Sequence, residues 1–318
     1  MPSPETRQVV ASKSADEIVT IVASKSRMPF SNEALVRVTA ISLNRGELRR
    51  AQRTADGILQ IGWDFVGTID TPAADGTGPV AGIRVVGFST RMEGWAERVA
   101  VPTSYIAPIP DGVSDAQAAT LPVAGLTALH SVDAAPSLLG RQALITGATG
   151  GVGMFAVQLA ALTGATAFAQ IRRAEQKSFI ESLGDFPTIL TTDGREFNDH
   201  EGFRLIVDGI SGAILANAIP ALAPDGICVC YGVTDTPEVP VDIGQFMRIG
   251  LAQIMGFHLY AKSVSSPPSE NLPRLLALVA DGRLNCAIGR ETSWTEINRV
   301  AQDLIDRKFF GKAVLHID

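Results

Sequence analysis

The segment from Ala143 to Ala160 constrains the fold of this chain more than any other. It reads ALITGATGGVGMFAVQLA. The apolar run at its start is typical of a buried strand, and the glycines that follow indicate a tight turn. Beyond the turn, Val152, Phe155, Leu159 and Leu162 are spaced by three and four residues, which places them on one face of a helix. The segment therefore predicts a strand, a glycine turn and a helix in direct succession.

The glycines stand at positions that have a physical use. Ala148, Gly150 and Gly153 follow the G-x-G-x-x-G spacing, with alanine in the first place. Gly150 would let the backbone approach a pyrophosphate, and Gly153 would let helix and strand pack closely. The helix that starts at Gly151 would turn unpaired N–H groups and its positive dipole end toward an anion. The pattern predicts a dinucleotide site; the alternative is a plain strand-to-helix turn. A Walker loop is excluded, because no Lys-Ser or Lys-Thr pair follows the glycines.

The same alternation of strands and helices continues along the chain. Further short apolar runs are expected to be strands, at Thr166–Ile171, Thr188–Leu190, Leu205–Val207 and Ile227–Tyr231. Helical patterns lie between most of them, and the second helix is expected to end at Gly184. This order predicts an α/β fold with a doubly wound parallel sheet.

Residues before about 115 have a different pattern. Glu17–Ala23 and Ala34–Ile41 alternate apolar and polar residues, as half-buried antiparallel strands do. After about residue 256 we expect a helix capped by Ser269, a helix over Thr295–Ile305 and a final strand in GKAVLHI, which return to the first domain. The predicted division is therefore residues 1–117, 118–256 and 257–318, with the first and last in one domain.

Composition excludes several classes of protein. With 318 residues, 46% of them hydrophobic and 19% charged, the chain is long and apolar enough for two folded domains. The net charge of −6, without a basic block, argues against a nucleic-acid or membrane partner. The uncharged run from Gln142 to Ile171 could span a bilayer by length, but its glycines and threonines favour a buried parallel sheet. Three cysteines and no secretory signal at the N-terminus predict a cytoplasmic protein.

The end of the second strand of the predicted parallel sheet carries two arginines. At this point an NAD site places an acidic residue that binds the ribose 2′-hydroxyl. This chain instead has Arg172 and Arg173, and Glu175 follows in the next loop or helical turn. Two guanidinium groups suit a 2′-phosphate, which predicts NADPH as the cofactor. The alternative is that both arginines are solvated surface charges.

Several separated motifs resemble the medium-chain dehydrogenase/reductase superfamily, and in particular its zinc-independent quinone oxidoreductase (zeta-crystallin-like) branch. They are AISLNRGEL, GWDFVG, EGWAERVAVP, LPVAGLTALHS, ITGATGGVG and the terminal GKAVL, in this order over nearly the whole chain. The resemblance implies a GroES-like β-barrel catalytic domain and a Rossmann cofactor domain. It also implies a homodimer that pairs strands near Ala252–Phe257.

The resemblance also implies a set of cofactor-binding residues. Thr127 would contact the nicotinamide, and Gly150, Gly151, Val152 and Gly153 would hold the diphosphate. The other matched positions are Asp208 and Gly209 beside the adenosine, Tyr231, Gly232 and Val233 near the nicotinamide ribose, and Phe257 and Lys312 close to the cofactor.

The chain departs from the zinc enzymes of the superfamily. Those enzymes place a Cys at the position of Asn44, and a His and a Glu at the positions of Trp63 and Asp64. A catalytic zinc needs three protein ligands, mostly nitrogen or sulfur donors. Cys228 and Cys230 lie on a predicted strand and are most simply core residues, and the four histidines are scattered. We therefore expect no bound metal.

Without a Lewis acid, conjugate reduction is an easier task than carbonyl reduction. Asn44 is the best candidate for a polar group at the reacting centre, although it could instead be a turn residue that bonds its own backbone. Tyr231 and Tyr260 are weaker candidates for a phenolic donor. Trp63 and Trp95 are candidates for the wall of an apolar substrate pocket, with a core position as the alternative.

The sequence thus predicts an NADPH-dependent, metal-free oxidoreductase that acts on a small molecule, either a quinone or an α,β-unsaturated carbonyl. One alternative is an enoyl reductase of specialised metabolism. Another is a cofactor-binding protein that senses NADPH or serves as a scaffold, with little turnover.

Overall fold

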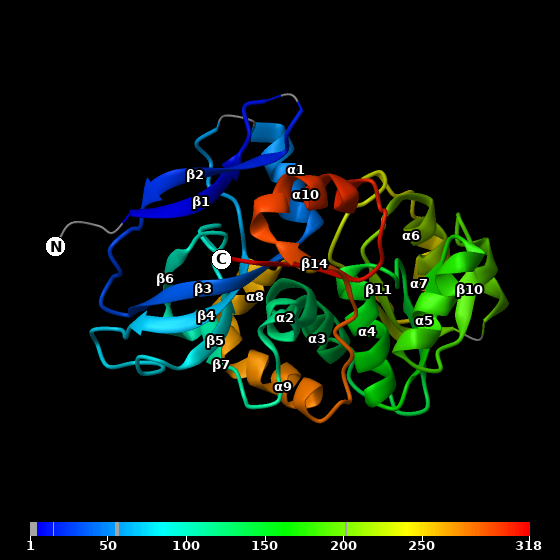
Figure 1. The fold of residues 1–318 in the computed structure, drawn as a ribbon. Coiled ribbons are helices and arrows are strands. Elements are labelled where there is room, and N and C mark those ends of the chain that lie inside the picture. Colours follow the sequence, from blue (N-terminus) through cyan, green and yellow to red (C-terminus); the bar gives the residue numbers. More distant parts are fainter. Residues whose placement is uncertain (1–4, 15, 55–56, 201) are drawn as a thin grey trace. The chain divides into compact units, whose positions relative to one another are not determined.

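The structure is a computed structural model that describes residues 5–14, 16–54, 57–200 and 202–318. The chain divides into two compact units (Figure 1). Unit 1 contains residues 1–126 and 260–318, and unit 2 contains residues 127–259. The chain therefore leaves unit 1 once and returns to it once, as the change of pattern along the sequence indicates.

Unit 2 is built on a six-stranded parallel sheet with the strand order β10-β9-β8-β11-β12-β13. Numbered from β8 along the chain, this order is 3-2-1-4-5-6, that of a doubly wound dinucleotide-binding fold. The order reverses between β8 and β11, and ligands of such folds bind beyond the carboxyl ends of the strands at that point. The strands are β8 (Gln142–Ile145), β9 (Thr166–Ile171), β10 (Thr188–Leu190), β11 (Phe203–Asp208), β12 (Leu222–Cys230) and β13 (Gln253–Gly256).

The helices of unit 2 connect these strands. α4 crosses from β8 to β9, and Phe155, Ala156 and Leu159 are among its buried residues. α5 ends at Gly184, whose φ of 152° few other residues adopt, as the sequence predicts. The helices are α3 (Leu126–Asp133), which begins at the last residue of unit 1, α4 (Gly151–Leu162), α5 (Lys177–Leu183), α6 (Gly212–Ala218) and α7 (Ile243–Ile249).

Unit 1 contains a largely antiparallel seven-stranded sheet and a separate hairpin of β1 and β2. The order is β14-β15-β3-β4-β5-β7, and β6 pairs with the free half of β3. The strands are β1 (Glu5–Ala11), β2 (Val19–Lys25), β3 (Glu33–Leu43), β4 (Asp64–Thr71), β5 (Arg84–Phe88), β6 (Arg98–Pro102), β7 (Ile106–Pro108), β14 (Ile288–Ser293) and β15 (Lys312–His316).

The C-terminal strand joins unit 1 to the beginning of the chain. β15 pairs antiparallel with β3, with Ala313 opposite Leu43 and Leu315 opposite Ile41. This pairing confirms the predicted return of GKAVLHI and brings Lys312 beside the end of β3. The helices of unit 1 are α1 (Arg45–Thr54), α2 (Asp115–Ala119), α8 (Leu259–Ser265, whose first residue belongs to unit 2), α9 (Pro268–Ala280) and α10 (Ile297–Ile305).

Two local predictions need correction. Ser269 does not cap a helix, because α9 already begins at Pro268 with Pro267 as its N-cap. A proline at the first helical position lacks the N–H that a serine cap would satisfy. Tyr231 lies outside β12, which ends at Cys230 and extends back to Leu222.

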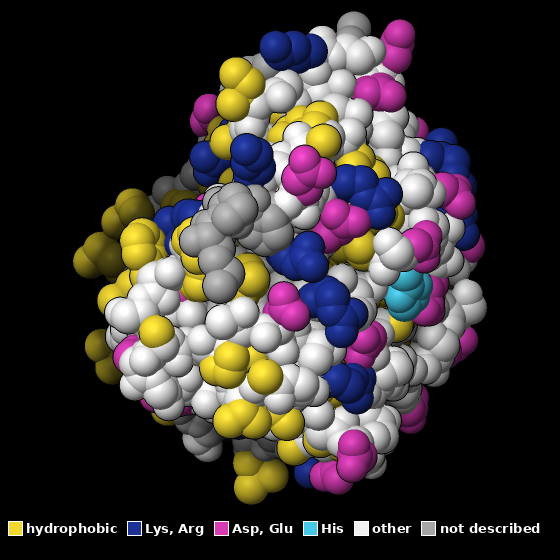
Figure 2. All heavy atoms as spheres, turned by 60° about the vertical axis from the view of Figure 1, so that its left-hand side comes forward, with side chains coloured by type: hydrophobic (Ala, Val, Ile, Leu, Met, Phe, Trp, Pro, Cys, Tyr) yellow, Lys and Arg dark blue, Asp and Glu magenta, His cyan; other side chains and the backbone are white. Residues whose placement is uncertain are grey.

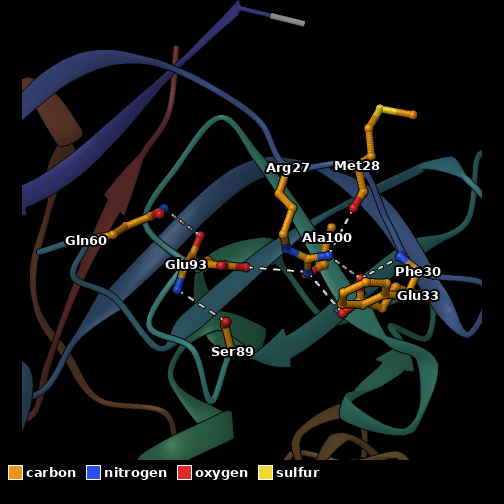
Figure 3. Close-up of polar contacts among 8 residues, drawn as sticks. All are labelled: Arg27, Met28, Phe30, Glu33, Gln60, Ser89, Glu93 and Ala100. Atoms are coloured by element: carbon orange, nitrogen blue, oxygen red, sulfur yellow. Dashed lines mark hydrogen bonds and ion pairs between the residues drawn. The ribbon is translucent and has the colours of Figure 1, made fainter. Parts of the chain in front are cut away.

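An arginine cluster ties together three segments of unit 1 (Figure 3). The guanidinium of Arg27 binds both carboxylate oxygens of Glu33 on β3, at 2.7 and 3.0 Å, and donates to the carbonyl of Ala100 on β6. It also lies 3.6 Å from a carboxylate oxygen of Glu93. These contacts hold the loop that carries the EGWAERVAVP motif against the sheet.

The surface shows charges of both signs. On the face in Figure 2, Lys and Arg side chains are interspersed with Asp and Glu, with small hydrophobic areas between them. This face therefore presents no large area of a single charge. Among the described residues, no helix combines the length and the apolar character needed to cross a bilayer.

Candidate functional site

The glycine turn between β8 and α4 brings two backbone segments into close contact. A Cβ on Gly153 would lie 2.4 Å from the carbonyl oxygen of Gly147 and 2.8 Å from the Cα of Ala148. Only glycine fits there without moving the backbone. Gly147 itself has a φ of 60°, which glycine adopts without strain. The two glycines therefore allow α4 to start directly above the end of β8.

The start of α4 carries backbone donors without acceptors. The N–H groups of Gly151, Val152 and Gly153 form no hydrogen bond within the described ranges, whereas Met154 donates to the carbonyl of Gly150 at 2.9 Å. Gly150 is exposed, and Gly151 and Val152 are half-buried, so an anion could reach this end of the helix. Unpaired amides and the helix dipole together favour a diphosphate at this position.

A glutamine that sequence reasoning missed holds the turn in place. Gln170 on β9 is buried, its Oε1 accepts from the N–H of Gly147 at 2.8 Å, and its Nε2 donates to the carbonyl of Thr191 at 2.9 Å. A single polar residue near the end of the apolar strand TAFAQI was the available signal. Its contacts tie the turn after β8 to the neighbouring strand β9.

A second glutamine shapes the loop that carries the two arginines. The Oε1 of Gln176 accepts from the backbone N–H groups of Arg172 and Arg173, at 2.8 and 3.0 Å. Its Nε2 donates to Oγ1 of Thr149 in the glycine turn, at 3.1 Å. Gln176 thus connects the arginine loop to the glycine turn, a link between distant segments that the sequence alone does not reveal.

The two arginine side chains differ in their surroundings. Both are exposed. Arg173 forms an ion pair with Glu175 at 2.8 Å, whereas the guanidinium of Arg172 has no ion pair or side-chain hydrogen bond in the part of the chain that is described. An anion bound at this loop would therefore meet one unpaired guanidinium and one that shares its charge with a surface carboxylate.

Asp208 lies at the point where the strand order reverses. Its carboxylate accepts from Oγ1 of Thr146 at 2.6 Å and from the N–H of Ser211 at 2.8 Å, and it is completely buried. Burial raises the pKa of this carboxyl above its ordinary value. The placement of Asp208 beside the adenosine stays a prediction. Its carboxylate is enclosed and bonded internally, so the side chain positions the adjacent turn.

The remaining predicted cofactor residues of unit 2 follow the ends of β11, β12 and β13, except Thr127, which lies in α3. The ring of Tyr231 covers Gly209 so closely that a Cβ on Gly209 would lie 2.3 Å from its hydroxyl. Burial, followed by the charge of Asp208, raises the pKa of Tyr231. The ring of Phe257 lies 6.2 Å from that of His130. Thr127 is buried at the start of unit 2, and Gly232 and Val233 follow Tyr231, with Val233 exposed.

Unit 1 contains a buried network around Lys312. Its Nζ donates to Oδ1 of Asn44 at 2.6 Å and to the carbonyl of Leu43 at 3.0 Å, and it lies 3.5 Å from Oδ2 of Asp64. Nδ2 of Asn44 donates to the same Asp64 oxygen at 2.8 Å. Because the ammonium can only donate and the carboxylate only accepts, the two groups determine which way the Asn44 amide points. One N–H of the amide group binds Asp64, and the amide has a second N–H that could donate to a ligand.

Glu47 completes this network. Its carboxylate accepts from the backbone N–H groups of Asn44 and Trp63, both at 2.7 Å, and it is completely buried. Burial and the charge of Asp64 raise the pKa of Glu47 well above its ordinary value. Burial also raises the pKa of Asp64 to about 6, although the charge of Lys312 opposes this shift. Burial lowers the pKa of Lys312 itself.

The structure shows the surroundings of Lys312 and Trp95. The ammonium of Lys312 is buried and directed at Leu43, Asn44 and Asp64, and its proximity to the cofactor stays a prediction. Of the two positions considered for Trp95, a pocket wall and the core, the structure has the core, because the ring is completely enclosed in unit 1. A large apolar ring in a close-packed interior contributes to stability and cannot meet a substrate.

Trp63 and Tyr260 form an aromatic pair near Asn44. Both are half-buried, and their rings meet edge to face at 5.9 Å. A Cβ on Gly46 would lie 2.8 Å from the Trp63 ring, so Trp63 packs directly against the start of α1. Burial raises the pKa of Tyr260, and the charge of Glu47 adds to this effect. Tyr260 therefore keeps its phenolic proton at neutral pH.

The residues at the zinc-ligand positions do not fit a metal. Lys312 already occupies the space beside Asn44 and Asp64, and its ammonium would repel a divalent cation. The indole of Trp63 offers no lone pair for a metal. Within the described ranges, no group of three His, Cys, Asp or Glu side chains could hold a metal ion. The sulfur atoms of Cys228 and Cys230 lie 4.0 Å apart as free thiols.

Comparison with known proteins identifies related sequences. The family model described as "Zinc-binding dehydrogenase" matches residues 151–281. One component of the phenolphthiocerol/phthiocerol polyketide synthase of Mycobacterium tuberculosis is 28% identical over 305 residues, which cover 92% of this chain but only 14% of that protein. The quinone oxidoreductase-like protein 2 homolog of Nematostella vectensis is 24% identical over 250 residues, covering 74% of this chain and 67% of that protein.

Solved structures share the fold over nearly the whole chain. The quinone oxidoreductase from Coxiella burnetii has a TM-score of 0.81 at 22% identity and covers 99% of this chain and 100% of its own. Mycobacterial Rv1454c complexed with NADPH has a TM-score of 0.84 at 22% identity, covering 99% and 100%. The CurK enoyl reductase has a TM-score of 0.82 at 21% identity, covering 98% and 99%. These structures establish the two-domain fold, with a GroES-like barrel and a Rossmann domain.

The raised pKa of Asp64 predicts a pH-dependent loss of stability. The folded chain holds this proton up to about pH 6, whereas an unfolded chain releases it near pH 4, so folding takes up a proton between these values. The contribution of Asp64 to the free energy of unfolding should therefore fall as the pH rises through about 6. We expect the wild-type protein to lose stability relative to Asp64→Asn over this range, measured by urea denaturation. A difference that stays constant or increases with pH would contradict the assignment.

Proposed function

We propose that this chain is a member of the medium-chain dehydrogenase/reductase superfamily, and that it is an oxidoreductase that transfers hydride from NADPH to a quinone or an α,β-unsaturated carbonyl without a catalytic zinc. The observation that carries the proposal is the start of α4, where three consecutive backbone N–H groups have no acceptor among the described residues and lie beside the reversal of strand order. Such a site suits the diphosphate of a dinucleotide.

The choice of NADPH rests on the loop after β9. Gly150, Gly151, Val152 and Gly153 would hold the diphosphate, and Arg172 and Arg173 would pair with the 2′-phosphate of the adenosine ribose. The unpaired guanidinium of Arg172 supports this choice. So does the absence of an acidic side chain from the first two positions after β9, where an NAD site would bind the 2′-hydroxyl.

Asn44 is the group that we assign to the reacting carbonyl. A bound NADPH would supply the hydride for addition to the β-carbon of the acceptor, and the C=C electron pair would move toward the carbonyl oxygen. The second N–H of the Asn44 amide would donate to this oxygen as its negative charge develops. Lys312 and Asp64 hold the amide in the required orientation. A proton from solvent completes the reduction.

An enoyl reductase of specialised metabolism is the second candidate function. The similarity to a polyketide synthase component over 92% of this chain favours it. Its chemistry is the same conjugate reduction, and only the acceptor differs, because the carbonyl belongs to an acyl thioester. The quinone and the enoyl proposals therefore share one cofactor site and one polar group.

A panel of acceptors tests the proposal directly. We expect NADPH consumption, followed by its absorbance, with at least one quinone, enone or enoyl thioester, and a ratio of one NADPH to one reduced acceptor. Metal analysis of the purified protein should find no stoichiometric zinc. Tight NADPH binding without turnover of any acceptor would contradict the proposed reaction and favour a cofactor sensor or scaffold.

The arginine pair provides a test of cofactor preference. Replacing Arg172 and Arg173 by alanine should weaken NADPH binding by about 1–3 kcal/mol and leave NADH binding nearly unchanged, because only NADPH carries the 2′-phosphate. Titration calorimetry with both cofactors measures the difference. Arg195→Ala, an exposed arginine of the same unit, is the matched control. An equal loss for NADPH and NADH would contradict the assignment.

Asn44 provides a test of the chemical step. Asn44→Ala removes one donor from the developing negative charge and should lower kcat by about 100-fold, with little change in the KM for the acceptor. Asn198→Ala, at an exposed position of unit 2, should leave both constants unchanged. If Asn44→Ala keeps the wild-type kcat, then the amide does not act on the reacting oxygen.

We also propose that the chain forms a homodimer through β13. This strand lies at the open edge of the unit 2 sheet, and Ile254 and the nearby Met247 and Leu251 are exposed, at 43%, 74% and 81%. An exposed apolar edge strand is a ready surface for pairing with a second copy. Light scattering should give twice the chain mass of 33.6 kDa. Ile254→Lys should give the monomer mass, and a monomeric wild-type protein would contradict the proposal.

A further inference from the structure

Helix α1 has an unusual concentration of positive charge. The whole chain has a net charge of −6, yet this short helix contains four arginines, namely Arg45, Arg49, Arg50 and Arg53, and only one acidic residue. That residue, Glu47, is completely buried and bonded to the backbone of Asn44 and Trp63. The exposed surface of α1 is therefore positively charged, and no exposed carboxylate of this helix offsets the charge.

The stability of the helix does not account for all of this charge. Arg53 lies in the last turn, where the helix dipole favours a cation, but Arg45 lies in the first turn, where the dipole disfavours one. Arg49 and Arg53 are four residues apart, a spacing at which like charges repel. The dipole of α1 therefore does not explain why Arg50 and Arg53 are both arginines.

Two of these arginines are available to a ligand. Arg50 and Arg53 are exposed, and neither guanidinium forms an ion pair or a side-chain hydrogen bond in the described part of the chain. Other arginines of unit 1 do have acidic partners, such as Arg27 with Glu33 and Arg84 with Asp115. Arg50 and Arg53 are therefore free to pair with an anionic ligand.

The available arginines share a helix face with the aromatic pair. Gly46, Arg50 and Arg53 are separated by four and three residues, so they lie on one side of α1. Trp63 packs against Gly46, and the ring of Tyr260 lies 5.9 Å from that of Trp63. Asn44 immediately precedes the helix.

We propose that Arg50 and Arg53 bind a phosphate group of the acceptor, and that the acceptor is an α,β-unsaturated acyl thioester of phosphopantetheine. This inference rests on the proposed function, in which the carbonyl of the acceptor meets Asn44. The arginines follow Asn44 by six and nine residues, which corresponds to about 9 and 14 Å along the helix axis. An anion on a small enone would lie nearer to Asn44 than this. The phosphate at the end of a pantetheine arm reaches this distance.

The chemistry of the proposed ligand agrees with its surroundings. A guanidinium forms two parallel hydrogen bonds with a phosphate, which a neutral quinone cannot accept. The apolar acyl chain and the pantetheine arm would pack along Trp63 and Tyr260. Coenzyme A and a carrier protein both present this phosphate, so the chemistry of the site is the same for the two sources. The inference favours the enoyl reductase over the quinone reductase.

Equilibrium binding tests the inference without requiring turnover. Calorimetry should compare butyryl-phosphopantetheine with butyryl-pantetheine, which lacks the phosphate. We expect the phosphorylated compound to bind the wild-type protein at least about tenfold more tightly, and raised salt to reduce this difference. Arg50→Gln/Arg53→Gln should abolish the preference. Arg283→Gln, an exposed arginine after α9, should retain it.

Equal binding of the two compounds to the wild-type protein, or an unchanged preference in the double variant, would overturn the inference. Butyryl-CoA and a butyryl carrier protein separate the two sources of the phosphate: whichever binds more tightly than butyryl-phosphopantetheine has further contacts. Loss of NADPH-dependent reduction of every acceptor would instead contradict the proposed function. The binding comparison would still decide whether the arginines recognise a phosphate.

Discussion

The close approach of α4 to the turn after β8 is the constraint on which the proposed cofactor site depends. A side chain at Gly153 would collide with the backbone of Gly147, so only a pair of glycines allows the helix to begin at this point. Gln170 holds the same turn against β9. As a result, the unpaired N–H groups of α4 lie at the reversal of strand order, where parallel sheets bind their ligands.

The second constraint is the buried charge in unit 1. Burying a lysine and two carboxylates in the protein interior costs free energy unless each of them is paired and hydrogen-bonded. Lys312 meets this requirement by bonding Asn44 and Leu43 and lying beside Asp64, and Glu47 meets it through two backbone N–H groups. The network orients the amide of Asn44 and occupies the region where a metal would need ligands. We therefore attribute polarisation of the acceptor to an oriented amide.

The helices and strands were largely predictable, because the pattern of apolar, polar and glycine residues that indicates each helix or strand lies within that helix or strand. Strands β9 and β10 have the predicted bounds, and the predicted doubly wound parallel sheet is confirmed. The links between distant segments were not predictable. Gln176 joins the arginine loop to Thr149, and Lys312 reaches Asn44 across most of the chain. The burial of Trp95 and of the Asp208 carboxylate could not be predicted from their motifs either, because burial depends on the packing of remote residues.

The most direct measurement is the affinity of the wild-type protein for the two pyridine cofactors, determined by titration calorimetry on protein freed of bound nucleotide. The helix-terminal amides and the arginine loop predict one NADPH bound per chain, with NADH bound more weakly. Should neither cofactor bind, the amides at the start of α4 have no dinucleotide ligand, and the proposed hydride transfer is excluded however closely the fold resembles that of its relatives.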